Sequence, residues 1–213
     1  MKVWGKCKLI KIIKIVFIII LVSLLTSCSG IVPETGINSE NNNFIENNLV
    51  AENDIKTKTS SVYLDVPYQR YAGKNWCLPA SGSMTLDFFG VPISQQELAQ
   101  RIIKPDGLGD IYKMVRYAKE LGFEASFTVL SMEQIEEYIS NQIPLIAIQE
   151  YKESNPLAHA RVIIGFNSDK REIITNDPTI GKNYTMSYEK YMDLNLTANP
   201  KYSMAIVISP KLL

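Results

Sequence analysis

Two residues that can act together in covalent catalysis stand out in this chain of 213 residues. His159 is its only histidine, and Cys77 directly precedes a helix-period apolar pattern that ends near Gly90. A thiol at a helix N-terminus lies among unpaired backbone N–H groups and near the positive end of the helix dipole, which both stabilise a thiolate. An imidazole beside it would deprotonate the thiol and later protonate a leaving group. Cys77 and His159 are therefore candidates for nucleophile and general base.

A third polar residue, Asp177, could fix the orientation and tautomer of that imidazole. Asp177 lies 18 residues after His159, near the end of the next apolar run, and "NSDK" at 167–170 has the composition of a hairpin turn. If the two runs pair as antiparallel strands, the start of one lies beside the end of the other. The pattern predicts that His159 and Asp177 are neighbours at one edge of a sheet.

Acyl transfer also needs hydrogen-bond donors for the oxyanion that develops on the carbonyl. The backbone N–H of Cys77 is one candidate, and the side-chain amide of Gln69, eight residues earlier, is a second. Each residue of this set also has an ordinary structural explanation: a packed thiol, a core histidine, a turn-forming aspartate. Cys77, His159 and Asp177 are also zinc-ligand types, but neither Cys-x-x-Cys nor His-x-x-x-His spacing is present. We expect no metal and no cofactor.

The elements that must position these residues read as helices first and strands later. Residues 77–89 form the first expected helix. Ser94 with Glu97 predicts the start of a second helix, Asp110 that of a third, and Ser131 with Gln134 that of a fourth. Short β-branched runs predict strands at 123–130, 144–150, 160–166, 172–177 and 204–209. We expect Tyr151–Ala158 to be an exposed loop near the site. The order favours an α+β fold with N-terminal helices packed on an antiparallel sheet.

The N-terminal segment has the pattern of an export signal. Five lysines precede an apolar run of 11 residues, Ile15 to Leu25, too short to span a membrane but typical of a signal-peptide core. "LTSC" at its end resembles the lipobox of bacterial lipoproteins, which implies removal of residues 1–27 and a lipid on Cys28. Residues 28–60 are polar and rich in Asn and Glu, as in a disordered tether, and residues 61–213 are long enough for one domain.

The composition and the cysteine count exclude some classes of function once the leader is removed. The remaining chain, from residue 28 on, would carry a net charge of about −5 without a basic cluster, which argues against nucleic acid as a partner. Of three cysteines, Cys7 leaves with the leader and Cys28 carries the lipid, so Cys77 is the one free thiol expected.

The motifs "VPYQ…WCLPASGSM", "HARVIIGF" and "NDP" together resemble the bacteriocin-leader (double-glycine) peptidases, family thirty-nine of the cysteine peptidases. The resemblance implies a papain-like fold. It places the nucleophile on Cys77, the base on His159 in a pattern that ends at Gly165, the orienting acid on Asp177 and the oxyanion glutamine on Gln69. Two positions depart from the family pattern: Leu78 stands where glycine often follows the nucleophile, and the glutamine usually lies six residues before it.

These features predict a membrane-anchored, extracytoplasmic cysteine peptidase or amidase that cleaves peptide bonds through a Cys-His-Asp triad. Its expected partners are a peptide or protein substrate and the membrane, and the chain is expected to be a monomer. The sequence does not separate hydrolysis from acyl transfer to another amine. A non-catalytic surface binding module on the same fold is the alternative.

Overall fold

The computed structural model describes residues 59–152, 155–197, 199 and 201–211. The predicted leader (1–27) and tether (28–60) therefore lie outside the described residues, except for the last two positions. All described residues belong to one compact unit, Asp54–Leu213. Its elements, in chain order, are β1 (Ser61–Tyr63), α2 (Cys77–Phe88), α3 (Gln95–Ile102), α4 (Ile111–Glu120), β2 (Glu124–Leu130), α5 (Met132–Ser140), β3 (Leu145–Lys152), β4 (Asn155–Asn167), β5 (Glu172–Asp177), β6 (Gly181–Ser187), α6 (Tyr188–Asp193) and β7 (Ser203–Ser209).

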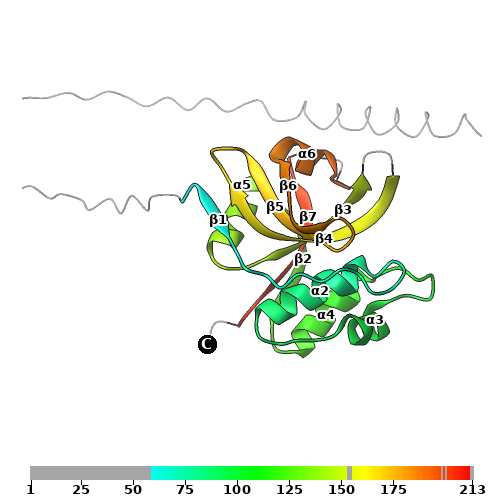
Figure 1. The fold of residues 1–213 in the computed structure, drawn as a ribbon. Coiled ribbons are helices and arrows are strands. Elements are labelled where there is room, and N and C mark those ends of the chain that lie inside the picture. Colours follow the sequence, from blue (N-terminus) through cyan, green and yellow to red (C-terminus); the bar gives the residue numbers. More distant parts are fainter. Residues whose placement is uncertain (1–58, 153–154, 198, 200, 212–213) are drawn as a thin grey trace, which may run out of the picture. The chain divides into compact units, whose positions relative to one another are not determined.

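The strands form one antiparallel sheet in the order β2-β7-β3-β4-β5-β6, and β1 pairs with the far end of β4. Figure 1 shows α2, α3 and α4 gathered together on one side, with the long strands β4 and β5 above them. The predicted α+β class is confirmed. The last helices in the chain also pack against the sheet, α5 mainly against β4 and α6 against β5 and β6.

Apolar side chains cover both faces of the central strands. In β3, Leu145 and Ala147 belong to the core shared with α5 and α6, whereas Ile146 and Ile148 belong to the core shared with α2, α3 and α4. Successive side chains of a strand point to opposite faces, so this strand is buried on both sides. That is why its sequence is a continuous apolar run rather than an alternating one.

Side-chain caps begin the helices where the sequence predicts them. Ser94 accepts a hydrogen bond from the N–H of Glu97 (3.1 Å), and Asp110 accepts one from Lys113 (3.0 Å). Ser131 and Gln134 form a reciprocal capping box at α5, at 2.9 and 3.3 Å. Within the part of the chain that the structure describes, no helix is long and apolar enough to cross a membrane.

Three elements and one connection differ from the prediction. β1, β6 and α6 were not expected, because they are short or polar and lack a clear apolar period. The expected loop at Tyr151–Ala158 is wrong: β3 continues to Lys152 and β4 begins at Asn155, and the two pair with each other across a bulge. The ladder of two long strands carries the extended conformation past the Asn-Pro pair that indicated a turn.

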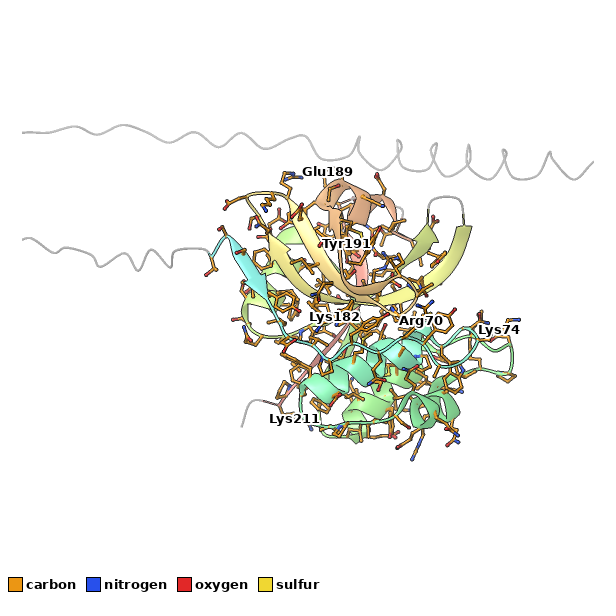
Figure 2. All side chains as sticks on the ribbon, in the orientation of Figure 1. Arg70, Lys74, Lys182, Glu189, Tyr191 and Lys211 are labelled. Carbon is orange, nitrogen blue, oxygen red and sulfur yellow. The ribbon has the colours of Figure 1, made fainter. Side chains whose placement is uncertain are left out.

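The short helix α6 is held by buried tyrosines and by an exposed ion pair. Tyr191 is fully buried, and its hydroxyl lies 2.9 Å from Ser203 Oγ. Glu189 lies at the surface, where it accepts hydrogen bonds from the guanidinium of Arg171. Figure 2 shows Tyr191 inside the strand-rich part of the molecule and Glu189 at its periphery. Burial of its two tyrosines, Tyr188 and Tyr191, thus stabilises a helix too short to be recognised by its period.

Candidate active site

Cys77 is the first residue of α2, and its thiol is half-buried at the helix start. Among the described residues, no side chain caps this helix, because the N-cap residue is Trp76. The N–H groups of Leu78 and Ala160 and the imidazole of His159 lie close to the thiol and stabilise its anionic form. Burial by itself raises the pKa of the Cys77 thiol, but these donors and the charge of His159 outweigh it and hold the pKa below its ordinary value.

His159, on β4, lies between the thiol and a buried carboxylate. Its Nε2 is 3.0 Å from both oxygens of Asp177, which leaves Nδ1 as the ring nitrogen for Cys77. The ring of Tyr151 packs edge-on against the imidazole, with centroids 5.2 Å apart. Burial lowers the pKa of His159, but its hydrogen bonds to Asp177 and Cys77 outweigh burial and raise the pKa above its ordinary value. The imidazolium is therefore favoured.

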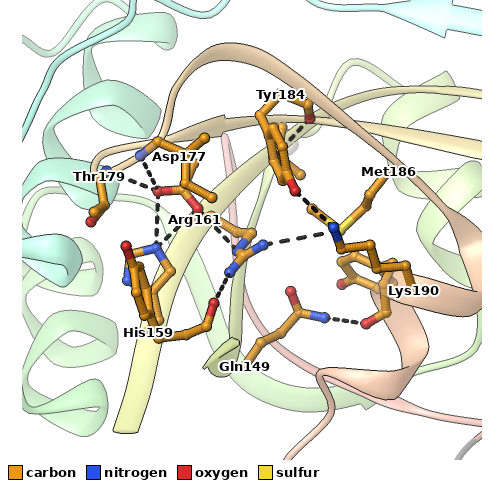
Figure 3. A network of polar contacts seen from close by, with 12 residues as sticks. Gln149, His159, Arg161, Asp177, Thr179, Tyr184, Met186 and Lys190 are labelled. Atoms are coloured by element: carbon orange, nitrogen blue, oxygen red, sulfur yellow. Dashed lines mark hydrogen bonds and ion pairs between the residues drawn. The ribbon is translucent and has the colours of Figure 1, made fainter. Parts of the chain in front are cut away.

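Asp177, at the end of β5, is fully buried and accepts several hydrogen bonds (Figure 3). Oδ1 accepts from the N–H groups of Thr179 (2.8 Å) and Ile180 (3.0 Å), and Oδ2 lies 3.4 Å from Arg161 Nε. Burial raises the pKa of Asp177, but His159, Arg161 and the Ile180 N–H outweigh it and hold the pKa below its ordinary value. Asp177 therefore closes the β5–β6 turn and contacts the imidazole at the same time.

The β4–β5 hairpin places these groups by its register. Val162 pairs with Asn176, so one step further along the two strands Arg161 stands opposite Asp177. His159 is two residues before Arg161, and residues two apart in a strand share a face. At Gly165, β1 pairs closely with β4: a Cβ on Gly165 would lie 2.6 Å from the carbonyl oxygen of Val62. The glycine of the His-x-x-x-x-x-Gly pattern thus has a packing reason.

Gln69 lies beside this group rather than within it. Its Oε1 accepts hydrogen bonds from Ser83 Oγ (3.2 Å) and Gln95 Nε2 (3.0 Å). Gln95 is itself oriented by the Ala72 N–H, which donates to its Oε1. The amino end of the Gln69 amide is therefore the end that can donate elsewhere. Gln69 lines a neighbouring hollow of about 640 Å³, and Trp76 lies between this hollow and the cleft because it lines both.

Cys77 and His159 line a cleft of about 810 Å³ between the helices and the sheet. Its walls are mostly apolar, with Trp76, Leu108 and Ile148 among them. Two lysines, Lys74 and Lys104, and no acidic residue are among the described residues that line the cleft. Lys104 is 3.4 Å from Asp106, which lies outside the lining. An extended peptide that is neutral or weakly negative would fit such a cleft in size and charge.

Sequence reasoning missed two residues that contact the imidazole and the carboxylate. Arg161 and Tyr151 touch Asp177 and His159 from β4 and β3. The even spacing of Arg161 from His159 was a signal for the former, once the strand was recognised. Tyr151 was assigned to a loop. In the described part of the chain, the structure contains no group of three or more His, Cys, Asp or Glu side chains able to hold a metal.

Comparisons with solved structures place this fold among peptidase domains. The peptidase domain of Streptococcus ComA, a bifunctional ABC transporter involved in quorum sensing, is 21% identical with a TM-score of 0.54, covering 68% of this chain and 98% of that one. A C39-like peptidase from Bacillus anthracis is 18% identical with a TM-score of 0.56, covering 72% and 99%. At these identities the likeness shows the fold, and the predicted papain-like architecture is confirmed.

A further solved structure carries a peptide. The double-glycine motif protease of an AMS/PCAT transporter, solved in complex with a leader peptide, is 17% identical with a TM-score of 0.54, covering 70% of this chain and 95% of that one. No curated protein matches the chain. The Peptidase_C39 like family matches residues 63–199, which is more than half of the sequence and contains all four candidate site residues. This chain belongs to the Peptidase_C39 like family.

Proposed function

We propose that the protein is a cysteine peptidase that cleaves peptide bonds through Cys77, His159 and Asp177. The observation that carries the proposal is the continuous chain of contacts from thiol to imidazole to buried carboxylate. The lowered pKa of Cys77 and the raised pKa of His159 both favour a thiolate–imidazolium pair. Such a pair is the activated nucleophile of acyl-transfer chemistry.

In the proposed reaction, the Cys77 thiolate attacks the scissile carbonyl carbon and the carbonyl π electrons move to oxygen. The tetrahedral intermediate collapses as the imidazolium Nδ1–H protonates the leaving amine, which leaves a thioester on Cys77. The neutral imidazole then takes a proton from water, and the hydroxide formed attacks the thioester carbonyl. Release of the carboxylic acid restores the thiolate–imidazolium pair, while Asp177 keeps the ring oriented throughout.

The oxyanion donors proposed are the backbone N–H of Cys77 and the amino end of the Gln69 amide. The hydrogen bonds that Ser83 and Gln95 donate to Gln69 Oε1 support the second assignment. Because the amide oxygen faces these two residues, the amide NH2 group points away from them and is free to donate to a substrate. Loss of one oxyanion donor costs about 10²–10³ in kcat in well-studied hydrolases. We expect Gln69→Ala to lose about that much while the rate of Cys77 alkylation is unchanged. If Gln69→Ala turns over substrate at the wild-type rate, Gln69 is not an oxyanion donor and the backbone N–H of Cys77 remains as the proposed donor.

A peptide is the substrate class proposed. The family supports it, and the solved transporter protease shows a leader peptide bound to a protein of the same fold. The cleft between helices and sheet is mostly apolar, and its charged lining residues are lysines in the described part of the chain. Peptides with apolar side chains and without clustered basic residues should bind best.

Anchoring to a membrane through a lipid on Cys28, on the extracytoplasmic side, is part of the same proposal. It rests on the lysine-rich leader, the short apolar run and "LTSC" before a polar segment. In cells, the full-length chain should be recovered in the membrane fraction with a lipid-modified Cys28. Recovery of Cys28→Ser in the same fraction and amount would argue against the lipid anchor.

A non-catalytic binding module on the same fold is the second candidate. The observation that favours it is the location of Gln69, which lines a hollow beside the cleft instead of the cleft itself. A binding module should retain its peptide ligand, uncleaved, in both the wild type and Cys77→Ala.

Turnover of a peptide library separates the two candidates. The full-length protein is incubated with the library and new N-termini are identified by mass spectrometry, with Cys77→Ala as the inactive control. The peptidase account predicts cleavage that depends on Cys77 and a thioester adduct trapped on it at low pH. Peptides that bind but are never cleaved, with equal affinity for wild type and Cys77→Ala, would favour the binding module.

A further inference from the structure

We propose that Arg161 is a positioning residue of the active site, which holds the outer oxygen of Asp177 and moderates the charge that this carboxylate presents to His159. The inference rests on the proposed function and extends it to a residue that touches neither thiol nor substrate. Arg161 lies on β4, two residues from His159, with its side chain directed at Asp177 (Figure 3).

Burial makes Arg161 unusual. Its side chain is 1% exposed, and a guanidinium stays charged in proteins. Charged side chains are almost never fully buried unless they are paired. A buried ion pair gains little net stability, because the loss of hydration offsets the attraction. Proteins in which both partners are replaced by apolar residues are often as stable. Stability of the fold is therefore a weak reason for an arginine at this position. The contacts of its side chain give a better one.

The contacts of Arg161 lead to the site. Nε lies 3.4 Å from Asp177 Oδ2, and Nη2 is 3.5 Å from the backbone oxygen of Tyr151, whose ring packs on the imidazole. Nη1 is 4.0 Å from the sulfur of Met186. Two of the three contacts thus belong to residues that touch His159 on different sides. A planar guanidinium can serve both at once, whereas an ammonium acts as a single point charge.

The two oxygens of Asp177 are held by different groups. Oδ1 accepts the N–H groups of Thr179 and Ile180, which fix the turn, while Oδ2 faces Arg161. His159 Nε2 is equidistant from both, at 3.0 Å. Without Arg161, the carboxylate would keep its turn contacts but present a less neutralised charge to the imidazolium. Arg161 thus tunes the acid without being needed to hold the turn.

Removal of a positive charge raises the pKa of every titrating group near it, because the protonated forms are then less repelled. The groups concerned are Asp177 from β5, His159 on the same strand and Cys77 from α2. Tyr191, from α6, also feels the charge of Arg161, but its pKa of about 12 lies outside the range of the profile. Tyr184 and Lys190 form a contact of their own beyond Met186, at 3.1 Å (Figure 3).

The test is the pH dependence of Cys77 alkylation by iodoacetamide, read in the peptide that contains Cys77 by mass spectrometry. It compares the full-length wild type with Arg161→Met, Arg161→Gln and Arg161→Lys. Arg116→Met serves as the matched control, because Arg116 is exposed and pairs only loosely with Glu120 at 3.9 Å. Circular dichroism and thermal unfolding of every variant report whether the fold is retained.

In Arg161→Met, the titration of His159 should move to higher pH by about one unit, which is the size expected for one charge removed at short range. Arg161→Gln keeps a donor for Asp177 and should move in the same direction, so it carries the test if the methionine variant does not fold. Arg161→Lys should titrate like the wild type but hydrolyse peptide about tenfold more slowly, since one ammonium cannot contact both Asp177 Oδ2 and the Tyr151 backbone oxygen. Arg116→Met should match the wild type in both.

A profile that stays in place, or moves to lower pH, in folded Arg161→Met and Arg161→Gln would overturn the inference and leave Arg161 a structural residue. An ordinary thiol titration in the wild type itself would instead overturn the proposed function, before any arginine variant is read. The two failures are therefore distinguishable in one experiment.

Discussion

The side chains of Asp177, His159 and Cys77 come from three different elements, and each is held by more than one neighbour. Asp177 contacts both the imidazole and two backbone N–H groups, so its two tasks can be separated by a substitution that keeps the shape. The asparagine side chain has the same shape, and its oxygen can still accept the turn hydrogen bonds. What it lacks is the negative charge beside His159.

Asp177→Asn should therefore fold but lose activity. Without the anion, the pKa of His159 falls, so the upper end of the pH range of the thiolate–imidazolium pair moves to lower pH and the range becomes narrower. We expect kcat to fall at least tenfold and by no more than about 10⁴-fold. The measurement is kcat against pH, with thermal unfolding as the control for folding. A variant with a full-width profile and wild-type kcat would mean that the aspartate only closes the turn.

At this scale the sequence was informative where residue types are rare. One histidine, one thiol outside the N-terminal segment and a turn aspartate left few combinations, and the hairpin composition placed two of them together. Arg161 could not be recognised in the same way. Arginine is common at surfaces, and only the packing of α6 and β6 over that face of the hairpin shows it to be buried.

Gln69 shows the opposite difficulty. Its type and order along the chain agree with an oxyanion role, but the position of its amide depends on side-chain hydrogen bonds to Ser83 and Gln95 from α2 and a neighbouring helix. Gln95 is 23 or more residues away from the segment that it holds. No local pattern encodes such a contact.

At the scale of elements, β1 pairs with β4 so closely at Gly165 that only a glycine fits there. Gly165→Ala would place its Cβ 2.6 Å from the backbone oxygen of Val62, which cannot move without breaking the β1–β4 pairing. We expect a loss of about 1–3 kcal/mol in the free energy of unfolding. Because Gly165 and His159 lie on the same strand, activity should fall along with stability.

The matched control is Gly82→Ala, in the middle of α2. Its Cβ would approach the flexible end of Met114 (2.9 Å to Cε), and alanine favours the helix by up to about 1 kcal/mol. Urea denaturation of both variants is the measurement, and the control should stay within about 1 kcal/mol of the wild type. Equal stability of Gly165→Ala and the wild type would mean that β1 is not tightly bound to β4.

Helix boundaries were predictable because their caps are local. Asp110 and the pair of Ser131 and Gln134 act within four residues of themselves, and the helices begin where these residues predict. The strand at Asn155 and the short helix α6 were not predictable. Both depend on partners far along the chain: β3 for the strand, and burial of Tyr191 beside Ser203 for the helix.

At the scale of the whole molecule, two tyrosines of α6 are buried in the core that the sheet shares with α5 and α6. Burial raises the pKa of Tyr191 to about 12, and burial with the Glu136 contact raises that of Tyr188 further. A phenol whose folded pKa lies above its unfolded value of about 10 contributes stability that is present below pH ~10 and lost as pH rises. The fold should therefore weaken above pH ~10.

Tyr191→Phe isolates this effect. Between pH ~9 and ~11.5, the free energy of unfolding should fall by about 2 kcal/mol less in the variant than in the wild type. At neutral pH the variant should be less stable by about 1 kcal/mol, because the hydrogen bond to Ser203 is lost. Urea denaturation at each pH is the measurement. Parallel pH curves for the two proteins would show that Tyr191 ionises as freely in the folded state as in the unfolded chain.

The sheet, the helix start and the hairpin meet at one point, where a thiol is held by an imidazole and two backbone N–H groups. The rate of Cys77 alkylation as a function of pH, in the full-length wild type and in His159→Ala, reports the ionisation of the Cys77 thiol and needs no known substrate. We predict rapid alkylation of the wild type below pH ~7, whereas His159→Ala should need a pH near the ordinary thiol value of about 8.5. If both proteins titrate near that ordinary value, or if Cys77 reacts only after unfolding, the cysteine is a packed structural residue and the peptidase proposal is wrong.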